Sequence, residues 1–246
     1  MKKYVGIDWL RAVACIGIMA MHIATNNRYE ISGIIYQGII PSFADFVFLF
    51  MAISAFGISC GYYHKVMSGK INWTDFYKKR YIKILPFFLV LIIIDLMMNF
   101  SVHSLCEGFV EMTLLHGFIP KSFTVIGVSW FLGIVYVFYL IFPFYCVLIE
   151  NKRRAWGIFT ISIVLNYICL IYFDLNQTNF VCSFCFFVAG GLVYLYKDVL
   201  EGMKRYYSLP IVLVALCCYY IIGGNTLTRL MVTIALLGFS ISSDYK

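Results

Sequence analysis

The fold is decided by residues 7–26, which read IDWLRAVACIGIMAMHIATN, an apolar run interrupted by Asp8, Arg11 and His22. A helix of about twenty residues crosses the hydrocarbon core of a bilayer. Arg11 and His22 are separated by three helical turns plus about 20°, so they share one face, about 16 Å apart along the axis. An arginine inside a bilayer costs at least about 2.5 kcal/mol, and histidine changes charge readily near neutral pH. We therefore expect a functional site here, with a purely structural ion pair as the alternative.

The composition identifies lipid as the solvent for most of the chain. Hydrophobic residues make up 62% of the sequence and charged residues only 13%, whereas soluble domains contain about 25% charged residues. The net charge of +7 does not indicate nucleic acid as a partner, because the basic residues fall in short clusters between apolar runs. We predict an all-α, polytopic helix bundle that forms a single integral membrane domain over residues 1–246.

Eight apolar segments are predicted to be membrane helices, namely residues 7–26, 38–62, 82–100, 128–149, 156–173, 179–196, 208–223 and 228–242. With a cytoplasmic N-terminus, fifteen of the nineteen lysine and arginine residues fall at inner ends and loops, and Arg28, Lys121 and Arg229 fall outside. This bias predicts that the N-terminus is cytoplasmic. Asp8 and Arg11 interrupt the first run, and no small-residue cleavage site follows, so we expect a retained signal anchor.

Residues 101–127 are ambiguous, because their apolar part contains Glu107, Glu111 and His116. A full span there would move the basic cluster at residues 152–154 to the outer side, so we expect an outer-face or re-entrant helix. The pair Cys182-x-x-Cys185 has the spacing of a redox or metal motif. It has no partner pair and no nearby histidine, so we expect no metal.

Three further segments carry polar or aromatic signals. Residues 45–57 read DFVFLFMAISAFG; the small residues allow close helix approach, but packing does not explain Asp45. Residues 76–86 read FYKKRYIKILP, where Arg80 and Lys83 can face one phosphate ligand, although basic residues here could also only set the topology. Residues 129–143 read SWFLGIVYVFYLIFP, which alone indicates an interface anchor and a kinked helix.

Taken in order, these four segments resemble the acyltransferase 3 family of integral membrane acyltransferases. That family's pattern has an aspartate, a leucine-arginine pair and a histidine eleven residues later, then an aspartate-led aromatic run, a basic pair before proline, and a Trp-Phe-Leu helix. The matching residues are Asp8, Leu10, Arg11, His22, Asp45, Ser54, Phe56, Arg80, Lys83, Pro86, Trp130, Phe131, Leu132, Tyr139 and Pro143. The match covers residues 6–143, and residues 150–246 resemble the family only as apolar helices.

The resemblance implies transfer of an acyl group, usually acetyl, from cytoplasmic acyl-CoA to a hydroxyl of a surface glycan, a lipid-linked sugar or a small molecule. It implies a multi-pass protein of the bacterial cytoplasmic membrane, with no metal. His22 would be the general base, Arg11 would hold the donor or steady negative charge, and Asp8 would orient Arg11. Arg80 and Lys83 would bind the CoA phosphates. The weaker site candidates are Asp45, Trp130, Tyr139 and His116.

The chain departs from the family's pattern in several places. Ala55 replaces a usual glycine, which predicts looser helix packing, and Lys83 replaces a common arginine, which loses the bidentate fork. Some members have a glutamate shortly after Trp-Phe-Leu, but residues 133–135 read GIV here, so we assign no acid there. Family chains usually have about ten membrane helices, so we expect a short member or one that lacks its last helices. A transporter or flippase of a glycan or lipid intermediate is the main alternative, and a non-catalytic scaffold is the third.

Overall fold

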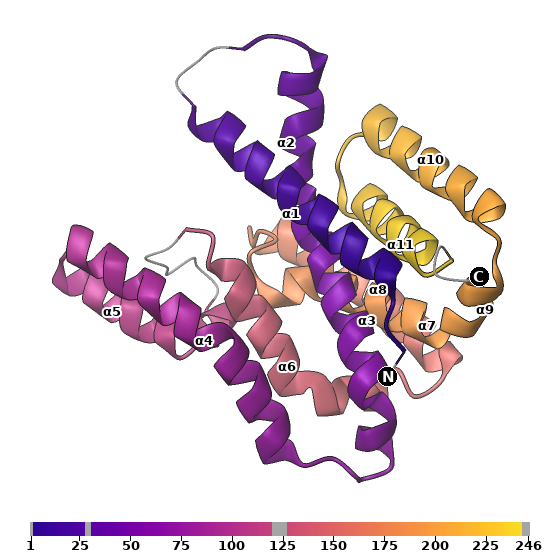
Figure 1. The fold of residues 1–246 in the computed structure, drawn as a ribbon, viewed down its shortest axis with the longest axis horizontal. Coiled ribbons are helices and arrows are strands. Elements are labelled where there is room, and N and C mark those ends of the chain that lie inside the picture. The colour runs from indigo at the N-terminus through magenta and orange to yellow at the C-terminus, as the bar shows by residue number, and fades with distance from the viewer. Residues whose placement is uncertain (1, 28–30, 120–126, 243–246) are drawn as a thin grey trace. The chain divides into compact units, whose positions relative to one another are not determined.

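The computed structural model describes residues 2–27, 31–119 and 127–242, and none of these residues forms a strand. The chain divides into two compact units (Figure 1). The first unit combines residues 1–61 with residues 186–246, and the second comprises residues 62–185. The boundaries fall within two helices, α3 and α8. Each unit is described below by itself.

The first unit joins the beginning of the chain to its end. Its elements are α1 (Val5–Asn26), η1 (Ile35–Ile39), α2 (Ile40–Ser42), η2 (Phe43–Asp45), most of α3 (Phe46–Met67), part of α8 (Phe180–Leu195), α9 (Lys197–Gly202), α10 (Arg205–Ile222) and α11 (Thr226–Ser242). Helices α10 and α11 lie side by side (Figure 1), and Val212, Ala215 and Ala235 form a buried cluster between them. Helix α1 packs against α2, η2 and α11.

The second unit contains the middle of the chain. Its elements are the end of α3, then α4 (Trp73–Met98), α5 (Val102–Met112), η3 (Leu115–Phe118), α6 (Trp130–Leu148), α7 (Lys152–Tyr172) and the start of α8. Phe88 and Ile92 of α4 form a buried cluster with Leu114 and with Tyr136 of α6. The segment η3 lies against α6.

The helical membrane bundle predicted from the sequence is confirmed. Six helices of the described ranges are long and apolar enough to cross a membrane, judged by length and composition. Two shorter apolar helices, α8 and α11, fall where the remaining two spans were predicted. In residues 101–127 the structure has the eleven-residue helix α5 and the short η3, and neither is long enough to span. Arg28 and Lys121 lie outside the described residues.

The largest correction concerns α4, which was predicted to begin at residue 82 and begins at Trp73. The lysines and the arginine of residues 78–83 interrupt the apolar run, so hydropathy alone did not include the first turns of α4 in the predicted helix. The side chain of Asn72 caps the helix, because its Oδ1 accepts a hydrogen bond from the Asp75 amide at 3.2 Å. Arg80 and Lys83 therefore lie two to three turns inside a helix that has already formed.

Candidate functional site

Helix α1 presents three different surfaces along its length. Trp9, Val13, Ile16, Met19 and Ile23 are exposed apolar residues at helical spacing, which suits contact with lipid. Ile7, Ala14 and Gly17 are buried. Because α1 is continuous from Val5 to Asn26, Arg11 and His22 share one face, about 60–80° from Ala14 by the helical repeat. Both side chains are half-buried and lie on a flank, off the lipid-facing stripe.

The guanidinium of Arg11 is held by the carboxylate one turn earlier. Arg11 Nη1 donates to Asp8 Oδ1 at 3.1 Å, and Lys3 Nζ lies 3.9 Å from Asp8 Oδ2. Arg11 Nη2 also faces Gly57 of α3, where an added Cβ would lie 3.5 Å away. These residues border a small cavity of about 110 Å³. The guanidinium thus points toward the N-terminus of α1, away from His22.

The N-terminus is tied to the short helix α9. Tyr4 Oη donates to Glu201 Oε1 at 2.6 Å, and Lys2 Nζ lies 2.7 Å from Glu201 Oε2. Burial acts to raise the pKa of the Glu201 carboxyl, but the hydrogen bonds from Lys2 and Tyr4 outweigh it and hold that pKa below its usual value. The contact fixes the entry of α1, and with it the Asp8–Arg11 pair.

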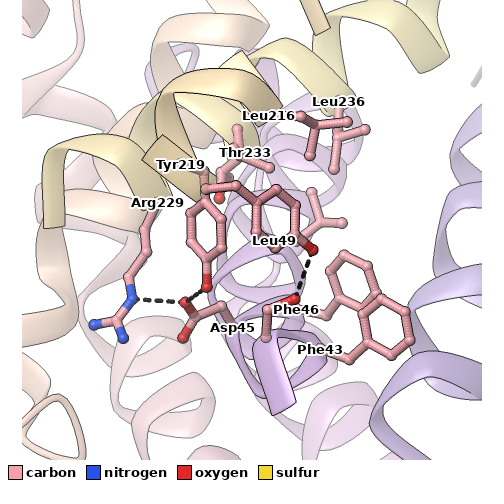
Figure 2. A pocket seen from close by; sticks show the side chains of 12 residues that line it. Phe43, Asp45, Phe46, Leu49, Leu216, Tyr219, Arg229, Thr233 and Leu236 are labelled. Atoms are coloured by element: carbon pink, nitrogen blue, oxygen red, sulfur yellow. Dashed lines mark hydrogen bonds and ion pairs between the residues drawn. The ribbon is translucent and has the colours of Figure 1, made fainter. Parts of the chain in front are cut away.

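Asp45 is the centre of a polar cluster formed by residues far apart in the sequence (Figure 2). Tyr219 Oη donates to Asp45 Oδ2 at 2.6 Å, and Arg229 Nε donates to the same oxygen at 2.8 Å. The side chains of Arg229 and Asp45 are only 25% and 19% exposed. The Arg229 guanidinium also lies 5.1 Å from the centroid of the Phe48 ring. Removing either partner of such a buried ion pair would leave the other charge buried without a counter-charge, which destabilises the protein strongly.

This Asp45 cluster separates two cavities. An apolar cavity of about 270 Å³ is lined by Phe43, Phe46, Leu49, Leu216 and Leu236, with Asp45 and Tyr219 at its edge (Figure 2). A more polar one of about 390 Å³ shares Asp45, Tyr219 and Arg229 and adds the Gly223–Gly224 turn. The chain enters the cluster through a π-helical and then a 3₁₀ segment before α3 begins, a departure from regular helix that is frequent at functional sites.

A glycine brings the apolar cavity next to α1. A Cβ on Gly17 would lie 2.6 Å from the Phe46 ring and 3.3 Å from the Phe43 ring, so only glycine allows these rings to touch the helix. The two rings are stacked, with centroids 5.3 Å apart. His22 lies about one and a half turns beyond Gly17 on the same helix. The first unit thus holds His22, Arg11 and the Asp45 cluster.

Arg80 lies in the second unit, inside a cage of aromatic rings. Its guanidinium carbon is 5.1 Å from the centroid of Tyr62, 5.6 Å from Phe76 and 5.4 Å from Tyr139. Within the described residues, its buried Nε has no hydrogen-bond partner. Lys83 is exposed one turn further along α4. The structure therefore brings Arg80 and Tyr139 together, and it gives Arg80 and Lys83 different surroundings.

His116 and Trp130 lie at the junction of η3 and α6. His116 is only 4% exposed, and its Nε2 donates to the Ser129 carbonyl oxygen at 3.0 Å. A Cβ on Gly133 would lie 2.5 Å from that nitrogen, so the glycine makes room for the ring. The hydroxyl of Ser129 donates to the buried Glu111. Trp130 begins α6 and contacts the Phe131 ring edge-on. His116 is thus part of a buried polar junction.

Sequence reasoning missed the two partners of Asp45. The sequence pattern indicates Arg229 only as a basic residue on the outer side, and it gives Tyr219 no role. The available signal was charge: an aspartate beside an apolar run needs a cation, and Arg229 stands at the edge of another apolar run. Within the described ranges, no group of three His, Cys, Asp or Glu residues could hold a metal ion.

Comparison with known proteins gives one match. The model of the acyltransferase 3 family, described as an acyltransferase domain, matches residues 4–243, which is nearly the whole chain. No curated protein matches the chain. No solved structure matches it either.

Proposed function

The chain belongs to the acyltransferase 3 family, and we propose that this multi-pass membrane acyltransferase moves an acyl group, most simply acetyl, from cytoplasmic acyl-CoA to a hydroxyl. The proposed acceptor is a surface glycan or a lipid-linked sugar, and the proposed location is the bacterial cytoplasmic membrane. The family match extends through residues 150–243, which supply Tyr219 and Arg229 to the Asp45 cluster.

One observation carries the proposal. His22 lies off the lipid-facing stripe of α1, on a flank shared with Arg11, in the unit that holds the Asp45 cluster. A helix that served only as an anchor would gain nothing from an imidazole and a guanidinium at these positions, since both are costly within a bilayer. A site for proton transfer and anion binding accounts for both residues.

In the proposed reaction His22 is the general base. Its unprotonated ring nitrogen takes the proton of the acceptor hydroxyl while the oxygen attacks the thioester carbonyl carbon. A C–O bond forms and the C–S bond breaks. The thiolate of CoA then takes the proton from His22 and leaves as the thiol. Because the Arg11 guanidinium points away from His22, we assign Arg11 to holding the donor and Asp8 to orienting Arg11. Lys83 stays our candidate for the donor phosphates, and Arg80, whose guanidinium lies among three aromatic rings, is assigned to positioning that region.

The acceptor is assigned to the cavities around the Asp45 cluster. With a cytoplasmic N-terminus, Asp45, Tyr219 and Arg229 all stand at outer helix ends, where a surface glycan is available. The more polar cavity offers carboxylate, phenol and guanidinium groups that hydrogen-bond sugar hydroxyls. The adjoining apolar cavity suits the chain of a lipid-linked acceptor.

The test uses membranes that contain the protein, labelled acetyl-CoA and the host's glycan fraction. We expect His22→Gln to lower label transfer by about 10²- to 10⁴-fold, the usual contribution of a general base. His64→Gln is the matched control, because His64 lies in the last turn of α3 outside the proposed site. Arg229→Gln should raise the KM for the acceptor and leave the KM for acetyl-CoA unchanged.

Three results would contradict the proposal. Full activity of His22→Gln would remove the base assignment. Movement of a glycan or lipid intermediate across the membrane without acetylation would favour a transporter. Neither transfer nor transport, with protein correctly inserted, would favour a scaffold.

A further inference from the structure

Helix α3 ends in a turn that brings two lysines together. Gly69 has a φ of +68°, the left-handed conformation that glycine adopts easily. The Lys70 amide donates to the Lys65 carbonyl at 2.9 Å, and the Gly69 amide donates to the Val66 carbonyl at 3.0 Å. This pair of bonds is the Schellman motif, which closes the end of a helix. The motif fixes the backbone of Lys70 beside that of Lys65.

The next helix completes a cationic cavity. Lys65 and Lys70 line a cavity of about 190 Å³ together with Asn72 and Lys79, from the cap and second turn of α4. Lys65 Nζ lies 5.6 Å from the centroid of the Tyr62 ring, which also lines the cavity. Three lysines thus line one small cavity at the junction of α3 and α4.

Arg80 holds one wall of this cavity in place. Its guanidinium lies over the Tyr62 ring and is also enclosed by Phe76 and Tyr139, so it joins α3, α4 and α6 within the second unit. The cationic groups of Lys65 and Arg80 therefore both lie over the Tyr62 ring. In this arrangement Arg80 positions the wall of the cavity, and Lys65, Lys70 and Lys79 line it.

We infer that this lysine cavity binds the phosphate esters at the nucleotide end of acyl-CoA. The inference rests on the proposed function and extends it. The terminal 3′-phosphate occupies the cavity at Lys65 and Lys70, and the diphosphate lies along Lys79 and Lys83. Those two lysines are one turn apart on the same face of α4, about 6 Å along its axis. This order leaves the thioester arm directed further along α4, away from its capped end.

Asp75 allows a test in which the affinity for the donor should change in the opposite direction. This residue, in the first turn of α4, also lines the cavity, and its negative charge opposes a bound phosphate. Removing that charge should strengthen binding of the donor, whereas removing a lysine should weaken it. A role in folding alone would not produce opposite effects on the affinity for one ligand.

The experiment measures binding of CoA and 3′-dephospho-CoA to the purified full chain in zwitterionic lipid nanodiscs. We expect Lys65→Ala with Lys70→Ala to raise the Kd of CoA about tenfold, since each exposed ion pair contributes roughly two- to fivefold. The double variant should bind 3′-dephospho-CoA with the same Kd as the wild type. In a thermodynamic cycle, the loss of the two lysines and the loss of the 3′-phosphate should therefore be coupled. Asp75→Asn should lower the Kd of CoA about twofold.

The matched control is Arg153→Ala with Lys204→Ala, two exposed basic residues at other predicted inner loops. It should leave both Kd values unchanged. An equal loss of affinity for CoA and 3′-dephospho-CoA in the Lys65/Lys70 variant would overturn the placement of the 3′-phosphate. An unchanged Kd for CoA would overturn the whole inference and leave the proposed function standing. If the wild type bound no CoA, the donor of the proposed function would be wrong as well.

Anionic lipid is the other source of phosphate at this position. Repeating the measurement in nanodiscs that contain phosphatidylglycerol separates the two sources. We expect the Lys65/Lys70 variant to lose CoA affinity in both lipid mixtures. If the variant instead associated with less phosphatidylglycerol than the wild type and its CoA binding were unchanged, the cavity would be a lipid site and the inference would be wrong.

Discussion

The imidazole of His116 shows how the fold assigns a role that residue type alone does not. Its Nε2 donates to a carbonyl oxygen, so in the neutral ring Nδ1 carries no proton. Among the described residues that buried Nδ1 has no hydrogen-bond partner. Burial lowers the pKa of His116, and the hydrogen bond to Ser129 opposes this effect only in part. The folded protein therefore keeps the ring neutral.

This burial predicts that acid destabilises the protein through His116. The unfolded chain takes up a proton at this histidine below about pH 6.5, and the folded chain does so only at lower pH. Protons thus favour the unfolded state, and stability falls as the pH drops below about 6.5, by at most about 1.4 kcal/mol per pH unit. Above that pH the group contributes no pH dependence. Melting temperatures of the purified protein at pH 7.5 and 5.5 measure the effect.

Two variants provide the comparison for this prediction. His116→Gln keeps an amide donor at the reach of Nε2 for the Ser129 carbonyl and should lose less stability between the two pH values than the wild type. His103→Asn, at an exposed histidine beside Glu107, should leave the contribution of His116 in place. Equal pH sensitivity of the wild type and His116→Gln would refute the assignment.

At the scale of elements, α3 and α8 pack closely within the first unit because both contribute small residues. A Cβ on Gly190 of α8 would overlap the Ala52 carbonyl and lie 2.9 Å from the Ala55 Cβ. Ala52 and Ala55 are both fully buried. The facing helix supplies a glycine at this contact, so Ala55 is closely packed in this chain. Small residues at such contacts let two backbones approach in a membrane protein.

Gly190→Ala should therefore destabilise the first unit, although alanine favours a helix. The added methyl has no space and should cost about 1–3 kcal/mol, as overpacking does. Gly157→Ala in α7 is the matched control, because nothing lies within 4 Å of the added Cβ and its helix should gain about 0.5–1 kcal/mol. Thermal unfolding of both variants in detergent measures the difference. Equal stability of the two would contradict the close α3–α8 contact.

At the scale of the whole molecule, the two ends of the chain meet in one unit. Asp45 binds Tyr219 and Arg229, which lie 174 and 184 residues further along the sequence. These contacts make the last two helices part of the candidate site. They also agree with a topology in which Asp45, the end of α10 and the start of α11 share one side of the membrane.

Reporter fusions test that topology. With α5 and η3 not spanning, fusions after residues 70, 151 and 203 should report the cytoplasmic side, and fusions after residues 100, 176 and 224 the outer side. If residues 101–127 formed a full span, the fusion after residue 151 and all later ones would report the opposite side. An outer-side signal after residue 70 would instead refute the cytoplasmic N-terminus.

Much of the fold could be predicted from the apolar runs, because a bilayer demands long helices that satisfy their own backbone hydrogen bonds. The start of α4 could not, because its basic residues are helical yet break the apolar run. For the site, the face shared by Arg11 and His22 followed from helical spacing. The pairing of Asp45 with Arg229 did not follow from helical spacing, because an ion pair between helices far apart in the sequence depends on how the chain folds back.

The sequence by itself determined the membrane class, the helix count to a close approximation, and the alignment of Arg11 with His22, since each depends only on local hydropathy or helical periodicity. Only the tertiary structure decided that Arg11 is held by Asp8 away from His22, that Arg80 lies among three rings, and that Lys65, Lys70 and Lys79 line one cavity. These outcomes depend on side-chain direction and on contacts between elements. A one-dimensional pattern contains neither.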